Sequence, residues 1–178
     1  IKILKKLPKK YQIIIVENST LQSTKKLEKK FKNTKVVIPE SNLGYAKAFN
    51  LAMEKCKNNF VLTLTPDVLI EKNMILKLEK FLSKFKNFSL LAPEYKNQKV
   101  YKNFIPLEDS GKAKLKINKY YVQKVKEIDW CFCVINKKKL KKLTILDENF
   151  FMYFETIDLC KQLLELKHKM YIIKGLNF

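Results

Sequence analysis

Short apolar runs alternate with helical patterns along this chain, and that alternation restricts its fold more than any other feature. The runs at residues 11–16 (YQIIIV), 35–38 (KVVI) and 60–64 (FVLTL) are rich in β-branched residues. Runs of this length and composition are typical of strands that are covered on both faces. Residues 24–31 and 45–55 lie between them and carry apolar side chains at helical spacing. This order predicts an α/β fold with a mostly parallel sheet and helices on both of its faces.

The rest of the chain continues the alternation. We expect a helix at residues 73–85, a strand at 89–92, a hairpin or long loop at 95–125, a strand at 127–135, a short lysine-rich helix at 137–142, a helix at 154–165 and a strand at 169–173. A length of 178 residues, with this much apolar sequence, predicts a single domain with a sizeable core.

The chain is strongly basic, yet it contains no arginine. Its 37 lysines stand against 17 acidic residues, which makes a formal net charge of +20. Specific nucleic-acid recognition depends heavily on bidentate arginine contacts, so no specific nucleic-acid partner is expected. The lysines have two interpretations that the sequence leaves open. They are either compositional drift spread over solvated faces, or an attraction to anionic membrane surface or nucleic acid.

The visible sequence contains neither an apolar run of the roughly 20 residues that a membrane span needs nor a signal-peptide pattern. We therefore expect a cytoplasmic domain, with peripheral contact at the inner face of an anionic membrane as a further expectation. Four cysteines without secretory context fit reduced thiols. Cys131 and Cys133 alternate along a predicted strand, but Cys160 and His168 are distant in sequence. A zinc site is therefore not expected.

Polar residues follow the predicted strands at the ends where such sheets bind ligands. In open α/β sheets the ligand lies beyond the carboxyl ends of the strands. Those ends are residues 17–19, 39–44 and 65–67 here. The sequence therefore places a candidate binding site among these three segments.

An aromatic run at residues 147–154 leads directly into a short acidic cluster. Glu155 and Asp158 are three residues apart, so they share the first turn of a helix that begins near Phe154. The helix dipole favours ionised carboxylates at this end. One interpretation is a pocket wall of aromatics with chemistry at its rim. The other is that both acids only complement the dipole while the aromatics, Phe150, Phe151, Tyr153 and Phe154, fill a core.

Five strings occur in the order IIIVENST, NLGYAKAFN, LTLTPDV, IDW and DENFFMYFETIDLC. Together they resemble the family 2 glycosyltransferases with the GT-A fold, nearest the bacterial rhamnosyltransferase-like branch. The resemblance implies a Rossmann-like sandwich that, as given, lacks the family's first strand and a C-terminal histidine. It also implies a nucleotide-sugar-binding half at residues 1–94 and an acceptor or catalytic half at residues 95–178.

The activity that the resemblance implies is a transfer, with inversion, of a sugar from a nucleotide-diphosphate sugar to a glycan or lipid-linked acceptor. In this family such transfers build surface polysaccharide. Glu17 and Asn18 stand where the family has an Asp-Asn pair that reaches the nucleotide. Asn42 and Gly44 stand in its Asn-x-Gly turn, whose glycine lets backbone approach the ribose and diphosphate. Asp67 stands where the last acid of the metal-binding motif holds a cation.

The chemistry of such a transfer asks for the same residue types. Carboxylate oxygens suit the Mg²⁺ or Mn²⁺ that offsets charge on a leaving diphosphate, and Asp67 is the candidate ligand. A second carboxylate must take the proton of the acceptor hydroxyl; Glu155 is the first candidate and Asp158 the second. Trp130 is either a face on which a sugar ring stacks or a core aromatic. Asp129 beside it would hydrogen-bond an acceptor hydroxyl.

One departure from the family pattern bears on catalysis. The family usually has Glu-Asp where this chain has Glu155-Thr156, and that Asp is the usual base. Threonine cannot take its place. Either Glu155 accepts the proton, or the chain is a noncatalytic module that retains a nucleotide-sugar or glycan site. A lysine-rich nucleic-acid binder is a third interpretation, disfavoured because arginine is absent.

Overall fold

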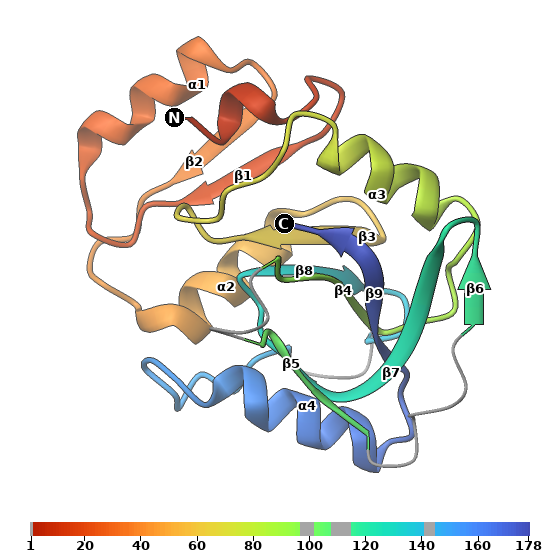
Figure 1. Ribbon diagram of the computed structural model, residues 1–178. Helices are drawn as coiled ribbons and strands as arrows, with labels where there is room; N and C mark the ends of the chain where they lie inside the picture. Colours follow the sequence, from red (N-terminus) through yellow and green to blue (C-terminus); the bar gives the residue numbers. More distant parts are fainter. Residues whose placement is uncertain (1, 97–101, 108–114, 141–144) are drawn as a thin grey trace.

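The computed structural model describes residues 2–96, 102–107, 115–140 and 145–178 (Figure 1). Its α-helices are α1 (Lys26–Lys30), α2 (Gly44–Lys55), α3 (Met74–Leu82) and α4 (Glu155–Glu165), and its 3₁₀ turns are η1 (Leu4–Lys6) and η2 (Gln22–Lys25). Its strands are β1 (Ile13–Val16), β2 (Thr34–Val37), β3 (Phe60–Leu64), β4 (Leu90–Glu94), β5 (Phe104–Pro106), β6 (Leu115–Ile117), β7 (Tyr120–Ile128), β8 (Phe132–Asn136) and β9 (Met170–Asn177). Seven of these elements, β1, α1, β2, α2, β3, β4 and α4, lie within two residues of the ends that the sequence predicts.

The described strands form two sheets. β1 and β2 pair in parallel, while seven strands form a larger sheet in the order β3-β8-β4-β9-β7-β5, with β6 on β7. Within the larger sheet the β4–β9 pair is parallel and the other described pairs are antiparallel. The α/β class is confirmed, but the expectation of a mostly parallel sheet is wrong. The reason is that β8 runs antiparallel between β3 and β4, and β7 is antiparallel to β9.

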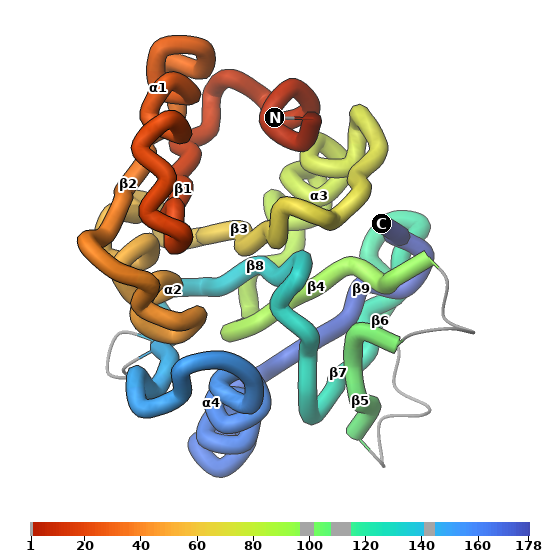
Figure 2. The backbone as a smooth tube through the Cα atoms, turned by 90° about the vertical axis from the view of Figure 1, so that its left-hand side faces the viewer, coloured from red at the N-terminus to blue at the C-terminus, as the bar shows by residue number. Residues whose placement is uncertain are grey.

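Helices cover both faces of the larger sheet, as the alternation predicted (Figure 2). On one face, α2 and α4 bury side chains such as Ala46 and Leu163 against the sheet. On the other face, α3 buries Leu78 and Phe81. Each strand of the central pair, β4 and β8, is therefore covered on both sides, and Phe132 at the start of β8 has no exposed surface.

The small sheet is less well covered than its sequence suggested. All four residues of β1, Ile13 to Val16, are only half-buried, although the run was expected to be covered on both faces. Among the described strands β1 pairs only with β2, and β3 pairs only with β8. Each of these two strands therefore has one edge that no described strand covers.

The strand expected at residues 127–135 is interrupted. β7 ends at Ile128 and β8 begins at Phe132, and the chain turns at Asp129, whose carboxylate accepts a hydrogen bond from the Cys131 amide at 2.8 Å. The sequence gives no sign of this turn, because Trp130 within it is buried and therefore continues the apolar pattern of the strand. The break places Asp129 at the end of the sheet that also carries the loop after β3.

The short lysine-rich helix expected at residues 137–142 is a turn at residues 137–140, and residues 141–144 lie outside the described part. The Lys137 ammonium instead donates to the carbonyl oxygens of Met53 and Cys56, at 2.9 and 2.8 Å. These carbonyls lie at the C-terminal end of α2, where a cation complements the helix dipole. Within the described residues, no helix has both the length and the apolarity to cross a bilayer.

Candidate functional site

The turn before α2 is held by two asparagine side chains. The Asn18 amide accepts a hydrogen bond from the Leu43 N–H at 2.9 Å and donates one to the Gly44 carbonyl at 3.0 Å. Asn42 accepts from the Gly44 N–H at 2.9 Å. The structure therefore brings Asn18, Asn42 and Gly44 together, as the sequence predicted. Asn18 follows β1, so this turn is fixed to the carboxyl end of that strand.

Gly44 also meets the loop that leads to α4. It has φ of +75°, and a Cβ built on it would lie 2.3 Å from the Phe151 carbonyl oxygen. The next amide, of Tyr45, donates to the same oxygen at 2.7 Å. The sequence explained this glycine by an approach to the diphosphate. In the structure, the close approach that requires a glycine is that of Phe151.

Asn50 makes a second connection between α2 and the same loop. Its amide donates to the Leu146 carbonyl at 2.8 Å and to Glu148 at 3.0 Å, and it accepts from the Leu146 N–H at 3.1 Å. Asn50 ends the string NLGYAKAFN, but the sequence alone indicates no role for it. The sequence signal for this contact is its place on the same helix, six residues after Gly44.

Glu155 is the first residue of α4 and is almost fully buried, at 5% exposed. Within the described residues its Oε2 atom has no hydrogen-bond partner. Tyr153 and Phe154 before it have φ of +69° and +67°, a conformation that costs about 1–3 kcal/mol for each such residue. A buried carboxylate oxygen without a hydrogen-bond partner also costs free energy. A ligand that donates a hydrogen bond to Glu155 would offset this cost and that of the strained backbone.

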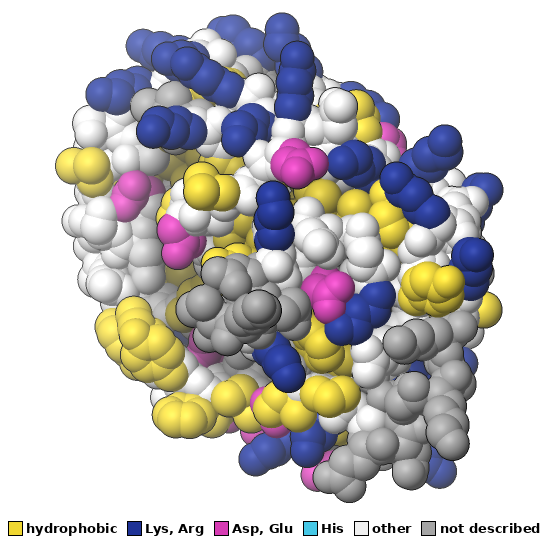
Figure 3. Space-filling model, viewed as in Figure 1, with side chains coloured by type: hydrophobic (Ala, Val, Ile, Leu, Met, Phe, Trp, Pro, Cys, Tyr) yellow, Lys and Arg dark blue, Asp and Glu magenta, His cyan; other side chains and the backbone are white. Residues whose placement is uncertain are grey.

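The aromatic run before Glu155 does not fill a core. Phe151, Tyr153 and Phe154 are 58%, 71% and 68% exposed, and Met152 is half exposed. Hydrophobic side chains gather over this loop on one face of the molecule (Figure 3). The interpretation that the run fills a core is therefore wrong for these residues, and the alternative of an apolar rim beside Glu155 agrees with the structure.

Tyr45 connects Glu155 to the end of the larger sheet. Burial raises the pKa of the Tyr45 hydroxyl well above its usual range, and the charges of Glu155 and Asp129 raise it further. The Tyr45 hydroxyl is therefore within electrostatic reach of both carboxylates. The sequence alone indicates no role for Tyr45. In the first turn of an amphipathic helix, a tyrosine with a function has the same sequence pattern as one that only fills the core.

Asp67 and Asp129 both act on Cys131. The Thr65 amide donates to the Cys131 carbonyl at 3.0 Å, which extends the β3–β8 ladder by one residue. Burial first, and then the charge of Asp129, raises the pKa of the Cys131 thiol to about 12, with a smaller contribution from Asp67. Both carboxylates therefore lie at the same end of the larger sheet, and Asp67 is exposed to solvent there.

Two other predicted residues, Glu17 and Asp158, make hydrogen bonds within the protein. The Glu17 carboxylate accepts hydrogen bonds from Thr24 at 2.9 Å and from the amide and hydroxyl of Ser19. The hydroxyls of Ser19 and Thr24 lower the Glu17 pKa. Asp158 accepts from Gln162 at 2.7 Å, one helical turn further along α4.

Trp130 is 2% exposed and packs edge-on against Phe49, with ring centroids 5.2 Å apart. It has no exposed face on which a sugar ring could stack in this structure. The indole therefore matches the core alternative that the sequence left open, and the expectation of a stacking face at Trp130 is corrected.

Two carboxylates, Asp67 and Asp129, are the side chains that could hold a divalent cation here. The described residues contain no group of three or more His, Cys, Asp or Glu side chains arranged to hold a metal. Mg²⁺ is commonly held by one or two carboxylates together with substrate phosphates, so the two carboxylates fit a cation that arrives with a diphosphate. They do not fit a cation held by protein ligands alone.

Several solved structures are similar to this one over nearly its whole length. GalNAc-T7 with UDP, GalNAc and Mn²⁺ superposes with a TM-score of 0.73 at 12% identity, over 96% of this chain and 38% of that one. The mannosyltransferase PcManGT from Pyrobaculum calidifontis, with GDP-Man and Mn²⁺, has a TM-score of 0.66 at 9% identity, over 93% and 46%. S. aureus TarS 1-349 has a TM-score of 0.64 at 16% identity, over 98% and 53%. The fold is therefore the GT-A glycosyltransferase fold.

The family model described as glycosyl transferase family 2 matches residues 1–144. The chain belongs to this family. It spans about 38–53% of the length of the three solved structures named above. No curated protein matches it.

Proposed function

We propose that this chain transfers a sugar from a nucleotide-diphosphate sugar to a hydroxyl of a glycan or lipid-linked acceptor, with Glu155 as the base. The observation that carries the proposal is the buried Oε2 atom of Glu155, which lacks a partner among the described residues and belongs to a carboxylate close enough to Tyr45 to act on its hydroxyl. An acceptor hydroxyl that donates to this oxygen would satisfy it.

The donor side of the proposed site is the turn that Asn18, Asn42 and Gly44 form. Its asparagine side chains are occupied in bracing the turn, so we assign them a positioning role around the nucleotide. Glu17 is ionised at neutral pH because its pKa is lowered, and its carboxylate shapes the loop after β1. Support for a nucleotide-sugar donor comes from two of the similar structures, which hold UDP with GalNAc and GDP-Man.

Asp67, with Asp129 beside it, would hold Mg²⁺ or Mn²⁺ against the donor diphosphate. A cation there would offset the negative charge that builds up on the leaving diphosphate. Two similar structures hold Mn²⁺, which supports the choice of a divalent cation for this chain.

In the proposed step the acceptor oxygen forms a bond to the anomeric carbon as the bond from that carbon to the diphosphate breaks. The proton of the acceptor hydroxyl passes to Glu155 Oε2. Attack from the face opposite the leaving group inverts the anomeric centre, a feature that we take from the resemblance to the family. Asp158 is a weaker candidate for the base because Gln162 already donates to its carboxylate.

The finer assignments rest on the sequence strings. We propose a rhamnosyltransferase-like member that acts in surface polysaccharide synthesis, in the cytoplasm or at the inner face of the membrane. The exposed apolar rim at residues 151–154 supports an acceptor with an apolar part, such as a lipid-linked glycan. The lysine-rich surface supports contact with anionic lipid.

A noncatalytic module that retains a nucleotide-sugar or glycan site is the second candidate. Thr156 favours it, because the family's usual base is absent at that position. The two candidates agree on binding and differ on turnover.

Glu155→Gln tests the base, and Asp158→Asn is its matched control. Nucleotide release is followed over a panel of nucleotide sugars and lipid-linked acceptors. Glu155→Gln should lower turnover by roughly 10²–10⁴-fold while nucleotide binding by calorimetry is retained. Asp158→Asn should keep most of the turnover. Equal rates for Glu155→Gln and the parent would refute the base, whereas nucleotide binding without transfer by the parent would favour the noncatalytic module.

Cys131 provides a readout of the cation that does not depend on turnover. Burial raises the pKa of its thiol, and negative charge on Asp129 and Asp67 raises it further, so a cation bound by these carboxylates should lower that pKa. The rate of Cys131 alkylation should then rise when Mn²⁺ and UDP are added together. In Asp67→Ala the additions should have no effect. A parent rate that ignores both additions would contradict the assignment of Asp67.

A further inference from the structure

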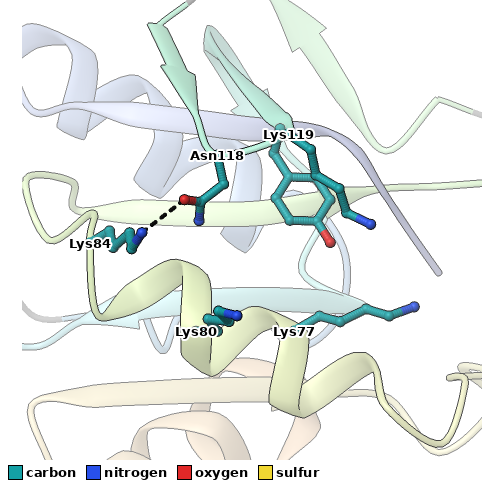
Figure 4. A pocket seen from close by; sticks show the side chains of 6 residues that line it. Lys77, Lys80, Lys84, Asn118 and Lys119 are labelled. Atoms are coloured by element: carbon teal, nitrogen blue, oxygen red, sulfur yellow. Dashed lines mark hydrogen bonds between the residues drawn. The ribbon is translucent and has the colours of Figure 1, made fainter.

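A cavity of about 470 Å³ lies between α3 and the turn that joins β6 to β7, away from the residues of the proposed site. Lys77 and Lys80 of α3 and Lys84 just after it line one side, and Asn118, Lys119 and Tyr120 line the other (Figure 4). A volume of this size is in the range of small-molecule binding pockets, roughly 300–1,000 Å³. Four of its six lining residues are therefore lysines.

The lining is richer in lysine than the chain as a whole. Lysine makes up 37 of 178 residues, about one in five, so six lining residues would contain one or two. Lys77 and Lys80 lie three residues apart on α3, and Lys84 lies in the turn that follows the helix. Like charges three residues apart repel one another, whereas the helix dipole favours cations at this end of a helix. The lining therefore places several positive charges close together at the end of α3.

Few acceptors compensate these charges. Lys77 pairs with Glu71 at 3.2 Å on the exposed surface, and Lys84 donates to the Asn118 side-chain oxygen at 2.9 Å. Glu79 also belongs to α3, but its carboxylate pairs with Lys10 at 2.5 Å. The ammonium group of Lys119 lies 5.5 Å from the centre of the Tyr120 ring. None of the described residues that line the cavity carries a carboxylate.

The two walls of the cavity are held in place by the core. Phe81 of α3 is buried and meets the ring of Tyr120 edge-on, with centroids 6.1 Å apart. Asn118 has φ of +54°, a conformation that asparagine tolerates in a tight turn. The hydrogen bond from Lys84 to Asn118 joins the walls directly. The backbone of both walls is therefore held in place, which lowers the entropic cost of binding a ligand.

We propose that this cavity binds a phosphate-bearing anion through Lys77, Lys80 and Lys119. Lysine is an established binder of phosphate, as a point charge with three donors. The same chemistry has two sources, the phosphate of an anionic lipid headgroup or a soluble phosphate compound. None of the lining residues belongs to the proposed transfer site, so the two proposals can fail separately.

The test compares two triple variants of equal charge. The cavity variant is Lys77→Gln, Lys80→Gln and Lys119→Gln. The control variant, Lys9→Gln, Lys32→Gln and Lys35→Gln, alters exposed lysines of a second hollow of about 500 Å³ near the start of β1. Each lowers the net charge from +20 to +17, since three lysines are removed. Circular dichroism and thermal unfolding confirm that both remain folded.

Binding is measured by sedimentation with vesicles of equimolar phosphatidylcholine and phosphatidylglycerol, and by calorimetry with inorganic pyrophosphate in the absence of divalent cations. Each lysine close to an anionic surface is worth roughly a fivefold factor in affinity, so the cavity variant should bind vesicles roughly 100-fold more weakly. The control variant should stay within roughly threefold of the parent.

The two probes distinguish the sources. Loss of vesicle binding alone by the cavity variant assigns a lipid headgroup. Pyrophosphate that binds the parent, fails to bind the cavity variant and displaces the vesicles assigns soluble phosphate compounds to the same site. Equal losses by the two variants would show that only net charge matters, and no loss by the cavity variant would show that its lysines bind nothing; either result overturns the proposal.

Discussion

β1 and β8 are both short apolar strands, but the structure covers them very differently. β8 lies inside the larger sheet, and all five of its residues are buried. Every residue of β1 is half-buried, because its sheet has only two described strands. The same kind of sequence therefore contributes unequal amounts of stability, and the difference depends on how many neighbours a strand has rather than on its composition.

The two regions also contribute different parts of the proposed site. The small sheet carries Glu17 and Asn18 at the end of β1, whereas the larger sheet carries Asp67 and Asp129. Gly44 and its helix α2 lie between them, since α2 packs against β1 and is buried against the larger sheet. Changes in each region should therefore separate stability from binding, and the expected effects are ordered by size below.

The largest contrast should come from truncation in the two kinds of strand. Phe132→Ala, in β8, empties a fully buried position and should cost about 3–5 kcal/mol of unfolding free energy. Ile15→Ala, in β1, removes a half-buried side chain and should cost about 1–2 kcal/mol. Denaturant titration followed by circular dichroism measures both. Equal losses would mean that β1 is as well packed as β8, contrary to its burial.

Gly44→Ala should give the next largest effect, with Gly175→Ala as its control. Both glycines have positive φ, +75° and +82°, so alanine is strained at either position. Only at Gly44 would the new Cβ lie 2.3 Å from backbone, since at Gly175 the nearest atom within reach is a Tyr120 ring carbon at 3.9 Å. Gly44→Ala should cost about 2–4 kcal/mol and Gly175→Ala about 1–2 kcal/mol.

Thermal unfolding of the two variants measures this difference. Hydrogen exchange would locate it, because the amide of Tyr45 should lose protection when Phe151 is displaced. If both variants were destabilised equally, the contact with Phe151 would contribute nothing.

Many elements could be predicted from the sequence, because a helix or strand that buries one face has apolar residues at a regular spacing. The strand at residues 60–64 and the helix at 154–165 are examples. The strand order could not, because nothing in the apolar runs shows that β8 inserts antiparallel between β3 and β4. The turn at Asp129 was hidden for a related reason: Trp130 is buried within the turn, so the apolar pattern continues through it.

The turn before α2 was predictable because one of the chain's three glycines follows an asparagine at a fixed spacing just after a predicted strand. Asn18, Asn42 and Gly44 come together as expected. Tyr45 was missed because a partly buried tyrosine on a helix is ordinary in sequence. The two alternatives for Trp130 stayed open, because the sequence cannot tell which side of an aromatic residue the core will cover.

The smallest expected effect is on the pH dependence of stability, through Glu17 at the end of β1. Hydrogen bonds from Ser19 and Thr24 lower the pKa of Glu17, so its folded pKa lies below the unfolded value. The stability that it contributes is therefore complete above the unfolded pKa of about 4.5 and is lost as pH falls through the lower folded value. The contribution should be at most about 1 kcal/mol, because the carboxylate is close to solvent.

Thr24→Val measures this contribution without removing the charge. It deletes one of the donors to Glu17, so unfolding free energy should fall less steeply with acidification than in the parent. Denaturant titrations at several pH values between about 3 and 6 would show the change. An unchanged pH dependence would mean that the hydroxyl does not contribute.

The uncovered edges of β1 and β3 also bear on how copies of the chain behave in solution. An open strand edge is a template for pairing with another molecule, and it leads to aggregation unless something opposes it. Among the described strands neither edge is covered. The net charge of +20 supplies an opposing force, because like-charged copies repel one another. Salt shortens the range of that repulsion from about 10 Å at 0.1 M to about 3 Å at 1 M. The lysines thus act as a colloidal stabiliser, and concentrated salt should convert a dispersed protein into one that associates through its edges.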